Sequence, residues 1–422
     1  MGKTIAEKIF SRASGKDVKA GDIVTAKVDM HYTLEIGTAE AHRRMIKAGL
    51  PDGLPSVADP DRLAIFLGDH QSCHAKPSDA NNYKLIRELA QRYGIKNLFD
   101  IDTGIAHAAV VQEGVARPGM LVCGKDSHST TPGGVNALGI PVSEIETAWI
   151  YATGELWFQV PETVKMVCRG TLPKGTCSKD VFLKIIGKYT PSMAQYKSIE
   201  WCGDLVDKLS MDARLTLSCH SIELGAKCAP FLPDKTCMDY VKATPRGGEP
   251  CYPTVPDEDA VYSAVYEEDF SDLAPQVALP HGFEDIRPVT DVLGVKIDQC
   301  NLGSCANGKI EDIQAVADIV KGRRVKVRTI FSPATYKIYA QAARMGLLAT
   351  LAEAGIMIQA PSCLDCAGRG ACIADGEVAM SATTRNFLGR YGSPHSSIYL
   401  ASPQTLAASA LTGVITDPRE FL

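Results

Sequence analysis

Short apolar runs alternate with helical patterns along the first third of the chain, and this rhythm constrains the fold more than any other feature. Strands are predicted by "RLAIFLGDH" at 62–70, "NLFDID" at 97–102 and "GMLVCGKDSHS" at 119–129. The stretch "NNYKLIRELAQRYGI" at 81–95 has the apolar spacing of an amphipathic helix. Strands that alternate with helices indicate βαβ units, so the sequence predicts an α/β fold with mostly parallel sheets.

Polar residues stand at the ends of these predicted strands or just past them. They are Asp69, His70, His107, Asp126 and His128. Ligands of parallel sheets collect beyond the carboxyl ends of the strands, so we expect these side chains at a functional edge. A single histidine near a strand end is more often structural. The prediction therefore depends on the whole set.

The chain has more residues than a domain with a single hydrophobic core usually contains. With 422 residues, two to three domains are expected. A strand, a Pro/Gly turn and a capped helix indicate a second α/β segment, and a stretch rich in Pro and acids at 244–272 precedes a third. We predict domain boundaries at 1–163, 164–286 and 287–422.

Charge and hydropathy exclude two classes of partner. The chain is 22% charged with a formal net charge of −5, and it has no basic block that would follow a phosphate backbone, so nucleic acid is not expected. The N-terminal stretch lacks the apolar region of a secretory signal, and no apolar run of about 18 residues follows it. These features predict a cytoplasmic protein without a membrane segment.

Three of the 14 cysteines stand in contexts that suit a metal. Cys305 lies in the turn "GSCANGKIED", directly ahead of an amphipathic run, and Cys363 and Cys366 form a Cys-x-x-Cys pair in "PSCLDCAGRGAC". Three thiolates leave one position of a metal site vacant, which a catalytic metal needs. A closed structural site would take a fourth ligand, such as Cys372 or a histidine.

Several stretches form one combination that covers nearly the whole chain. They are "GIAHAAVVQEGVARPGMLVCGKDSHSTTPGG", "ATGELWFQVPETV", "SMDARLTLSCHSIELGAK", "GSCANGKIED", the Cys-x-x-Cys pair followed by "ADGEVAMSATTRNFLGRYG", and "YLASPQTLAASALTGVITDP". This combination resembles the aconitase superfamily, and within it the large subunits of the isopropylmalate isomerase type. The resemblance implies a three-domain core with mostly parallel sheets around a central cluster cleft.

The resemblance also implies a cofactor and a set of site residues. Cys305, Cys363 and Cys366 would hold a [4Fe–4S] cluster whose fourth iron binds the hydroxyl and carboxylate of a substrate. The residues that would have catalytic roles are Asp69, His70, His107, Asp126, His128 and Glu223. Arg385 and Arg390 would bind the carboxylates of the substrate. A planar guanidinium clamps a carboxylate better than a lysine does. Without the family pattern, the two arginines would be ordinary ion-pair residues.

The activity implied is that of a hydro-lyase that removes and re-adds water on a malate-type hydroxy diacid. The candidate substrates are 3-isopropylmalate, homoaconitate-type acids, citramalate and 2,3-dimethylmalate. In single-chain aconitases a swivelling domain follows, whereas this chain ends after "ITDP". The resemblance therefore implies a separate small subunit and a hetero-oligomer. The alternative from another class is a non-catalytic protein that binds metal or senses iron on the same fold.

Some residues beside the expected cluster differ from the usual family pattern. Cys219 and His220 stand where an Asn-Met pair is usual, Ser362 stands where a glycine is usual, and Leu364-Asp365 stands where a Gly-Pro pair is usual. Adjacent Cys and His residues occur in both "SCHA" at 72–75 and "SCHS" at 218–221. If Cys73, His74, Cys219 and His220 converged, they would have the ligand types of a zinc site. The alternative is that Cys219 and His220 only reshape the pocket wall.

Overall fold

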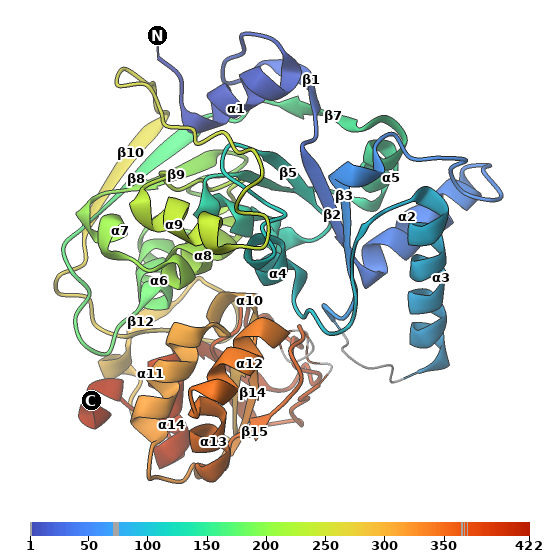
Figure 1. The fold of residues 1–422 in the computed structure, drawn as a ribbon. Helices are drawn as coiled ribbons and strands as arrows, with labels where there is room; N and C mark the ends of the chain where they lie inside the picture. Colours follow the sequence, from blue (N-terminus) through green and yellow to red (C-terminus); the bar gives the residue numbers. More distant parts are fainter. Residues whose placement is uncertain (1, 71–75, 364–365, 367, 369) are drawn as a thin grey trace. The chain divides into compact units, whose positions relative to one another are not determined.

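The computed structural model describes residues 2–70, 76–363, 366, 368 and 370–422, and the chain divides into two compact units (Figure 1). The first unit comprises Met1–Cys168, Ala194–Asp207 and Gly225–Glu268. The second unit comprises Arg169–Met193, Lys208–Leu224 and Asp269–Leu422. The division into three domains stays a prediction.

A five-stranded parallel sheet forms the centre of the first unit. Its strand order is β4-β3-β2-β5-β6. The strands are β2 (Met30–Leu34), β3 (Leu63–Phe66), β4 (Asn97–Phe99), β5 (Leu121–Gly124) and β6 (Leu138–Pro141). Every residue of β2, β3 and β5 is buried, as expected for parallel strands covered on both faces. The predicted α/β fold with parallel sheets is confirmed.

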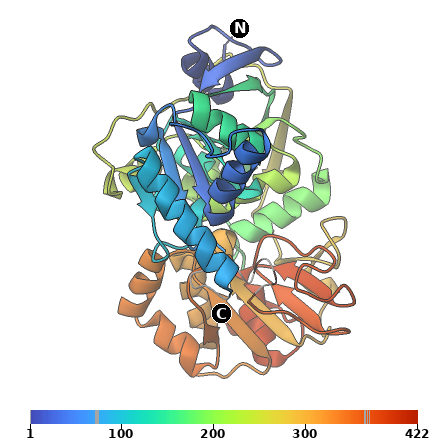
Figure 2. The same cartoon turned by 90° about the vertical axis from the view of Figure 1, so that its right-hand side faces the viewer.

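Helices cover this sheet and connect its strands. They are α2 (Glu35–Lys47), α3 (Pro77–Tyr93), α4 (Ala106–Gln112), the 3₁₀ segment η2 (Ser127–Val135) and α5 (Glu144–Thr153). Helix α2 contacts α3, α5 and strands β2 and β3, and the blue helices α2 and α3 lie over the sheet in Figure 2. Helix α3 begins four residues before the predicted helix because Pro77 suits its first turn. It ends at Gly94, whose φ of 69° caps the helix.

The rest of the first unit consists of smaller sheets with their own helices. Strands β1 (Ile23–Lys27) and β7 (Glu155–Gln159) form an antiparallel ribbon. A three-stranded sheet has the order β10-β8-β9. The remaining elements are α1 (Ile5–Ser14), η1 (Pro60–Arg62), β8 (Thr163–Arg169), β9 (Ser198–Cys202), α7 (Asp204–Lys208), α9 (Lys235–Ala243) and β10 (Ala264–Asp269).

A seven-stranded mixed sheet forms the centre of the second unit. Its order is β12-β11-β17-β16-β13-β14-β15, in which the strands from β17 to β15 run parallel, and β11 pairs antiparallel with both β17 and β12. The strands are β11 (Gln276–Ala278), β12 (Ile286–Pro288), β13 (Gln299–Gly303), β14 (Arg328–Ser332), β15 (Met357–Ile358), β16 (Val378–Ser381) and β17 (Ser397–Ala401).

The helices of the second unit include the amphipathic helix predicted after Cys305. This helix is α11 (Ile310–Val320), and its buried face contains Ile313, Val316, Ile319 and Val320. The others are α6 (Ser178–Tyr189), α8 (Met211–His220), α10 (Ser304–Asn307), α12 (Tyr336–Arg344), α13 (Leu347–Glu353), α14 (Pro403–Thr412) and the 3₁₀ segments η3 (Ser221–Leu224), η4 (Val289–Asp291) and η6 (Pro418–Phe421).

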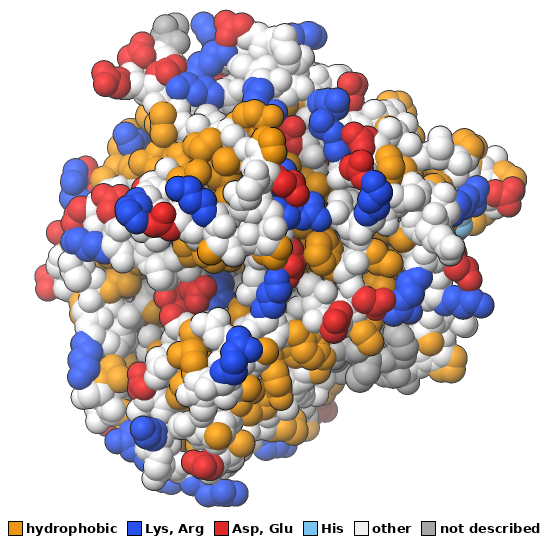
Figure 3. Space-filling model, in the orientation of Figure 1, with side chains coloured by type: hydrophobic (Ala, Val, Ile, Leu, Met, Phe, Trp, Pro, Cys, Tyr) orange, Lys and Arg blue, Asp and Glu red, His pale blue; other side chains and the backbone are white. Residues whose placement is uncertain are grey.

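Within the described ranges, no helix has the length and apolar character needed to cross a membrane. Basic and acidic side chains are interspersed on the face drawn in Figure 3. This mixture agrees with the small net charge of the sequence.

Candidate functional site

Three neighbouring strands of the first unit bring polar residues to one edge of its sheet. Strands β3, β2 and β5 are parallel neighbours, so their carboxyl ends coincide. Asp69 and His70 follow β3, Glu35 follows β2, and Asp126 follows β5. This edge therefore collects carboxylates and an imidazole from strands far apart in the sequence.

His70 lies between two buried carboxylates. Its Nδ1 is 3.2 Å from Asp69 Oδ2 and 3.3 Å from Glu35 Oε1, and its backbone N–H donates to Glu35 Oε1 at 2.8 Å. Burial lowers the pKa of His70, but Glu35 and Asp69 outweigh burial and raise this pKa to about 9. Burial raises the pKa of Asp69 to about 6, against the opposing charges of His70 and His107. The His70 imidazole is therefore protonated at neutral pH.

We expect the titration of His70 to depend on Glu35. In an NMR titration of the imidazole, the wild-type pKa should lie near 9. The substitution Glu35→Gln removes a charge and should lower the pKa by about one unit or more. Asp61→Asn, a change at an exposed ion pair with Lys96, should leave the titration unchanged. A wild-type pKa near 6.5 would contradict the account.

The sign of the stability effect follows from this raised pKa. The stabilising contribution of His70 is fully present below its ordinary pKa of 6.5 and is lost as the pH rises through about 9. At most it amounts to about 3 kcal/mol in the free energy of unfolding. Glu35→Gln should reduce this loss between pH 7 and pH 10.

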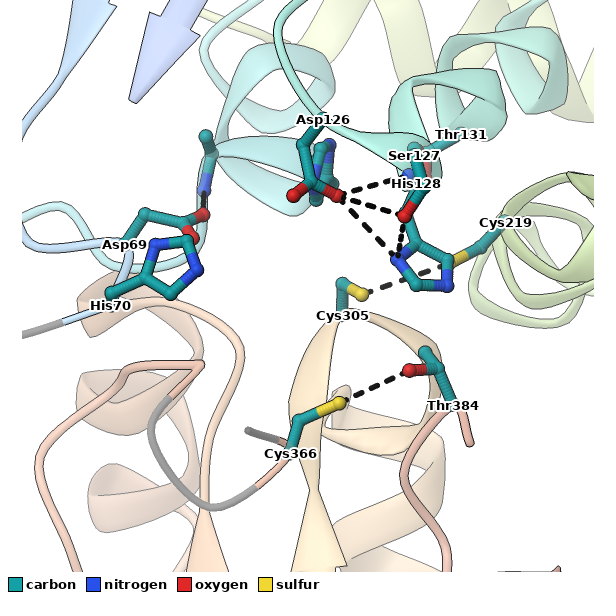
Figure 4. Close-up of polar contacts among 12 residues, drawn as sticks. Asp69, His70, Asp126, Ser127, His128, Thr131, Cys219, Cys305, Cys366 and Thr384 are labelled. Carbon is teal, nitrogen blue, oxygen red and sulfur yellow. Dashed lines mark hydrogen bonds and ion pairs between the residues drawn. The ribbon is translucent and has the colours of Figure 1, made fainter. Parts of the chain in front are cut away.

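Asp126 is held between two histidines. Its Oδ1 lies 3.3 Å from His107 Nε2 and 3.8 Å from His128 Nδ1, and the His128 backbone N–H donates to it at 3.2 Å (Figure 4). Burial alone would raise the pKa of Asp126, but hydrogen bonds from both histidines hold it well below its usual range. The ligand atoms of the three residues lie within 4.8 Å of one another.

Tyr32, in the middle of β2, completes this group. Its hydroxyl is 2.8 Å from His107 Nδ1. Because Asp126 is ionised, His107 donates its Nε2–H to it, and in the neutral imidazole Nδ1 accepts from the tyrosine O–H. Asp69 joins the same edge, since its Oδ1 accepts the N–H of Ala106, next to His107, at 2.5 Å. The arrangement can hold and transfer protons at defined nitrogen atoms.

In the second unit, neighbouring strands bring the three predicted cysteine ligands to the carboxyl edge of the sheet. Cys305 follows β13, and Gly303 at the end of β13 pairs with Ser332 at the end of β14. Ser332 Oγ donates to the carbonyl of Ser362 at 3.0 Å and accepts its N–H at 3.1 Å, which fixes the residue before Cys363 at this edge.

Cys366 reaches the same edge from the other side of β13. Its Sγ is 3.0 Å from Thr384 Oγ1, shortly after β16, the second neighbour of β13 (Figure 4). The Arg390 guanidinium donates to this sulfur at 3.5 Å. A hydrogen bond from Cys363, together with Arg390 and Thr384, outweighs burial and holds the pKa of Cys366 well below its usual range.

The donor set of this edge fits an iron–sulfur cluster. Such clusters are bound by thiolates, and the surroundings of Cys366 favour the thiolate. Cys305 is 2% exposed and Cys366 is likewise 2% exposed, so both sulfurs are shielded from water.

The two predicted arginines and the predicted glutamate also lie in the second unit. Arg385 Nε donates to Glu223 Oε1 at 2.7 Å, and both side chains are largely buried. Arg390 instead contacts Cys366. The structure thus joins Arg385 to Glu223 and Arg390 to the cysteines.

A buried lysine next to His220 is a feature that the sequence analysis missed. Lys179 Nζ lies 2.9 Å from His220 Nε2 and donates to the carbonyl of Thr383 at 2.6 Å. The His220 ring stacks on Phe182 with centroids 4.2 Å apart. Burial lowers the pKa of Lys179 to about 8, against the effect of nearby thiols that include Cys219.

Tyr32, Glu35 and Thr384 were also missed. Glu35 and Thr384 stand just after the carboxyl ends of parallel strands, whereas Tyr32 lies in the middle of β2. Applied to "HYTLE" and "SATT", the rule that singled out Asp69 and Asp126 would have found Glu35 and Thr384, but not Tyr32.

Part of the predicted zinc site lies outside the described residues. Cys73 and His74 belong to residues 71–75, which are outside the described residues. Leu364 and Asp365, which differ from the usual family pattern, are outside them as well. The proposed convergence of Cys73 and His74 with Cys219 and His220 stays a prediction.

Helix α8 is tied to α10 by a buried hydroxyl. Thr216 Oγ1 donates to the carbonyl of Ala306 at 2.6 Å and accepts from Lys309 Nζ at 2.8 Å. We expect Thr216→Val to lower the free energy of unfolding by about 1–3 kcal/mol, because the buried lysine loses an acceptor. Thr216→Ser keeps the hydroxyl and should cost less than about 1 kcal/mol. Equal losses in denaturant titrations of both variants would contradict this role.

Comparisons with known proteins agree with these features. The profile of the aconitase family (aconitate hydratase) matches residues 7–294 and 285–413. The 3-isopropylmalate dehydratase large subunit 1 of Methanopyrus kandleri is 40% identical to this chain over 425 residues, which cover 100% of both proteins. The large subunit from Halothermothrix orenii is 40% identical over 428 residues, with 100% of both chains covered. Large subunit 1 from Pyrococcus furiosus is 41% identical over 428 residues, which cover 100% of this chain and 99% of that protein. The chain belongs to the aconitase family.

Proposed function

We propose that this chain is the large subunit of a [4Fe–4S] hydro-lyase that isomerises 3-isopropylmalate by removing and re-adding water. The observation that carries the proposal is the ionised Asp126 between His107 and His128, beside a protonated His70, in a member of the aconitase family. Its relatives over the full length are named 3-isopropylmalate dehydratase large subunits. A protein that only stores or senses metal has no need of such an acid–base set.

Cys305, Cys363 and Cys366 would hold the cluster. When bound, the cluster supplies a Lewis-acidic iron for the hydroxyl and a carboxylate of the substrate. The chain favours the thiolate of Cys366 through Arg390 and Thr384, and burial shields its sulfur from water.

The histidines and carboxylates of the first unit would handle the protons. His70 carries a proton at neutral pH because Glu35 and Asp69 favour its charged form. That proton suits protonation of the departing hydroxyl group, and the resulting neutral imidazole can take a proton back on rehydration. Asp126 would fix the orientation of the His107 and His128 imidazoles.

The arginines of the second unit would bind the carboxylates of the diacid. A guanidinium offers two parallel N–H donors to a carboxylate, so Arg385 and Arg390 suit this task. Glu223 keeps Arg385 oriented at 2.7 Å until a substrate carboxylate competes for it. The partner would be a small subunit, as the names of the relatives suggest.

The test is an assay of the purified complex with a co-expressed small subunit. After anaerobic loading with iron and sulfide, 3-isopropylmalate should give the unsaturated diacid, whose conjugated double bond absorbs at short ultraviolet wavelengths. Parallel assays with homoaconitate, citramalate and 2,3-dimethylmalate distinguish a related dehydratase. Loss of activity with all four acids in a fully loaded complex would contradict the proposal and favour a metal-binding role.

A further inference from the structure

Two buried thiols of the second unit face each other. Cys219 lies near the end of α8 and Cys305 lies in α10, and their Sγ atoms are 3.6 Å apart. Their residues are 0% and 2% exposed. Figure 4 shows the two side chains directed toward one another.

Helix packing holds this pair in place. The bond from Thr216 Oγ1 to the carbonyl of Ala306 joins α8 to α10 one turn before Cys219 and one residue after Cys305. Lys309 Nζ contacts both bonded groups, Thr216 Oγ1 at 2.8 Å and the carbonyl of Ala306. The proximity of the thiols is therefore a property of the packed helices.

The separation suits a covalent bond between the two sulfurs. Sulfur atoms in a disulfide are about 2.05 Å apart, so Cys219 and Cys305 need to approach by only ~1.5 Å.

We propose that Cys219 and Cys305 form a reversible disulfide when the cluster-free chain meets a hydroperoxide. One thiolate attacks a peroxide oxygen, which gives a sulfenic acid and, after protonation, water. The second thiol attacks that sulfur, the S–S bond forms, and the hydroxyl group leaves as a second water. Two thiols are thus oxidised by two electrons, while hydrogen peroxide is reduced to two waters. A dithiol reverses the reaction by exchange.

The consequence concerns the assembly of the metal site. The disulfide removes one of the three predicted ligands, so the oxidised chain cannot accept a cluster until it is reduced. This consequence rests on the proposed function, but the formation of the disulfide does not. Cys219 thus links cluster loading to the redox state of the cell through a residue outside the predicted ligand set.

The test is disulfide mapping of the cluster-free full chain after exposure to hydrogen peroxide. Rapid alkylation, trypsin and mass spectrometry without reductant should reveal peptide 215–227 joined to peptide 297–309. Because the second peptide contains both Cys300 and Cys305, fragmentation must place the bond at Cys305. Dithiothreitol should abolish the linked species. Bonds confined to peptide 345–369, which contains Cys363 and Cys366, would overturn the proposal.

Two variants complete the design. Cys219→Asn should lose the linked species and should load iron equally well before and after peroxide. Cys372→Ser, which changes an exposed cysteine of the same unit, should still form it. In the wild-type chain, iron uptake should fall in proportion to the linked fraction and return with dithiothreitol. If the linked species forms but iron uptake does not fall, the disulfide is established. In that case Cys305 is not a ligand of the proposed cluster.

Discussion

Replacing Cys366 with serine should nearly abolish the iron bound after anaerobic reconstitution, from about four atoms per chain to a small fraction of that number. Iron–sulfur clusters require soft thiolate ligands, which a serine hydroxyl does not replace. In this chain, Cys363, Arg390 and Thr384 favour the Cys366 thiolate over the thiol. The loss should therefore be large, and it is read from iron and sulfide analysis together with the visible absorption of the cluster.

The matched control for this prediction is Cys372→Ser. Cys372 lies close in sequence and in the same unit, but it is exposed, and its Sγ contacts only the carbonyl of Gly368 among the bonds described for it. Iron content of that variant should equal that of the wild type. If Cys372→Ser lost iron as completely as Cys366→Ser, Cys372 would be a ligand and the three-cysteine site would be wrong.

Replacing Asp126 with asparagine should lower kcat of the loaded complex by about 10²–10⁴. The carboxylate of Asp126 orients the imidazoles of His107 and His128, from which it lies 3.3 Å and 3.8 Å away. A neutral amide retains the size but presents donors as well as an acceptor, so the imidazoles lose their shared anion. Iron content should stay at the wild-type level, because Asp126 is not among the predicted ligands.

The control is Asp61→Asn, an exposed carboxylate whose ion pair with Lys96 spans 3.3 Å in solvent. Such a pair contributes about 0–1 kcal/mol, so kcat should be unchanged. A fall in iron content for Asp126→Asn, with kcat per cluster preserved, would show that Asp126 serves the cluster rather than the protons.

The sequence predicted the parts of the site that follow local rules. Residues at the carboxyl ends of parallel strands are recognisable from the apolar run that precedes them, which is why Asp69, His70 and Asp126 were found. The helix after Cys305 was predicted because its apolar residues repeat with the helical period. These signals depend only on neighbours along the chain.

The missed features depend on packing between distant segments. The contact between Cys219 and Cys305 joins residues 86 positions apart, and the bond from Lys179 to Thr383 joins residues 204 positions apart. No local pattern reports such proximity. Lys179 would be expected at the surface, since a lysine is rarely buried without partners. Its burial follows from the acceptors that His220 and Thr383 provide.

The measurement that tests the central claim most directly is anaerobic reconstitution of the full chain with iron and sulfide, followed by metal analysis and EPR after mild oxidation. The account predicts about four irons per chain and a three-iron signal once the iron without a cysteine ligand is lost. Bound zinc, or no cluster in a folded chain, would contradict it and make this protein a non-catalytic member of the family.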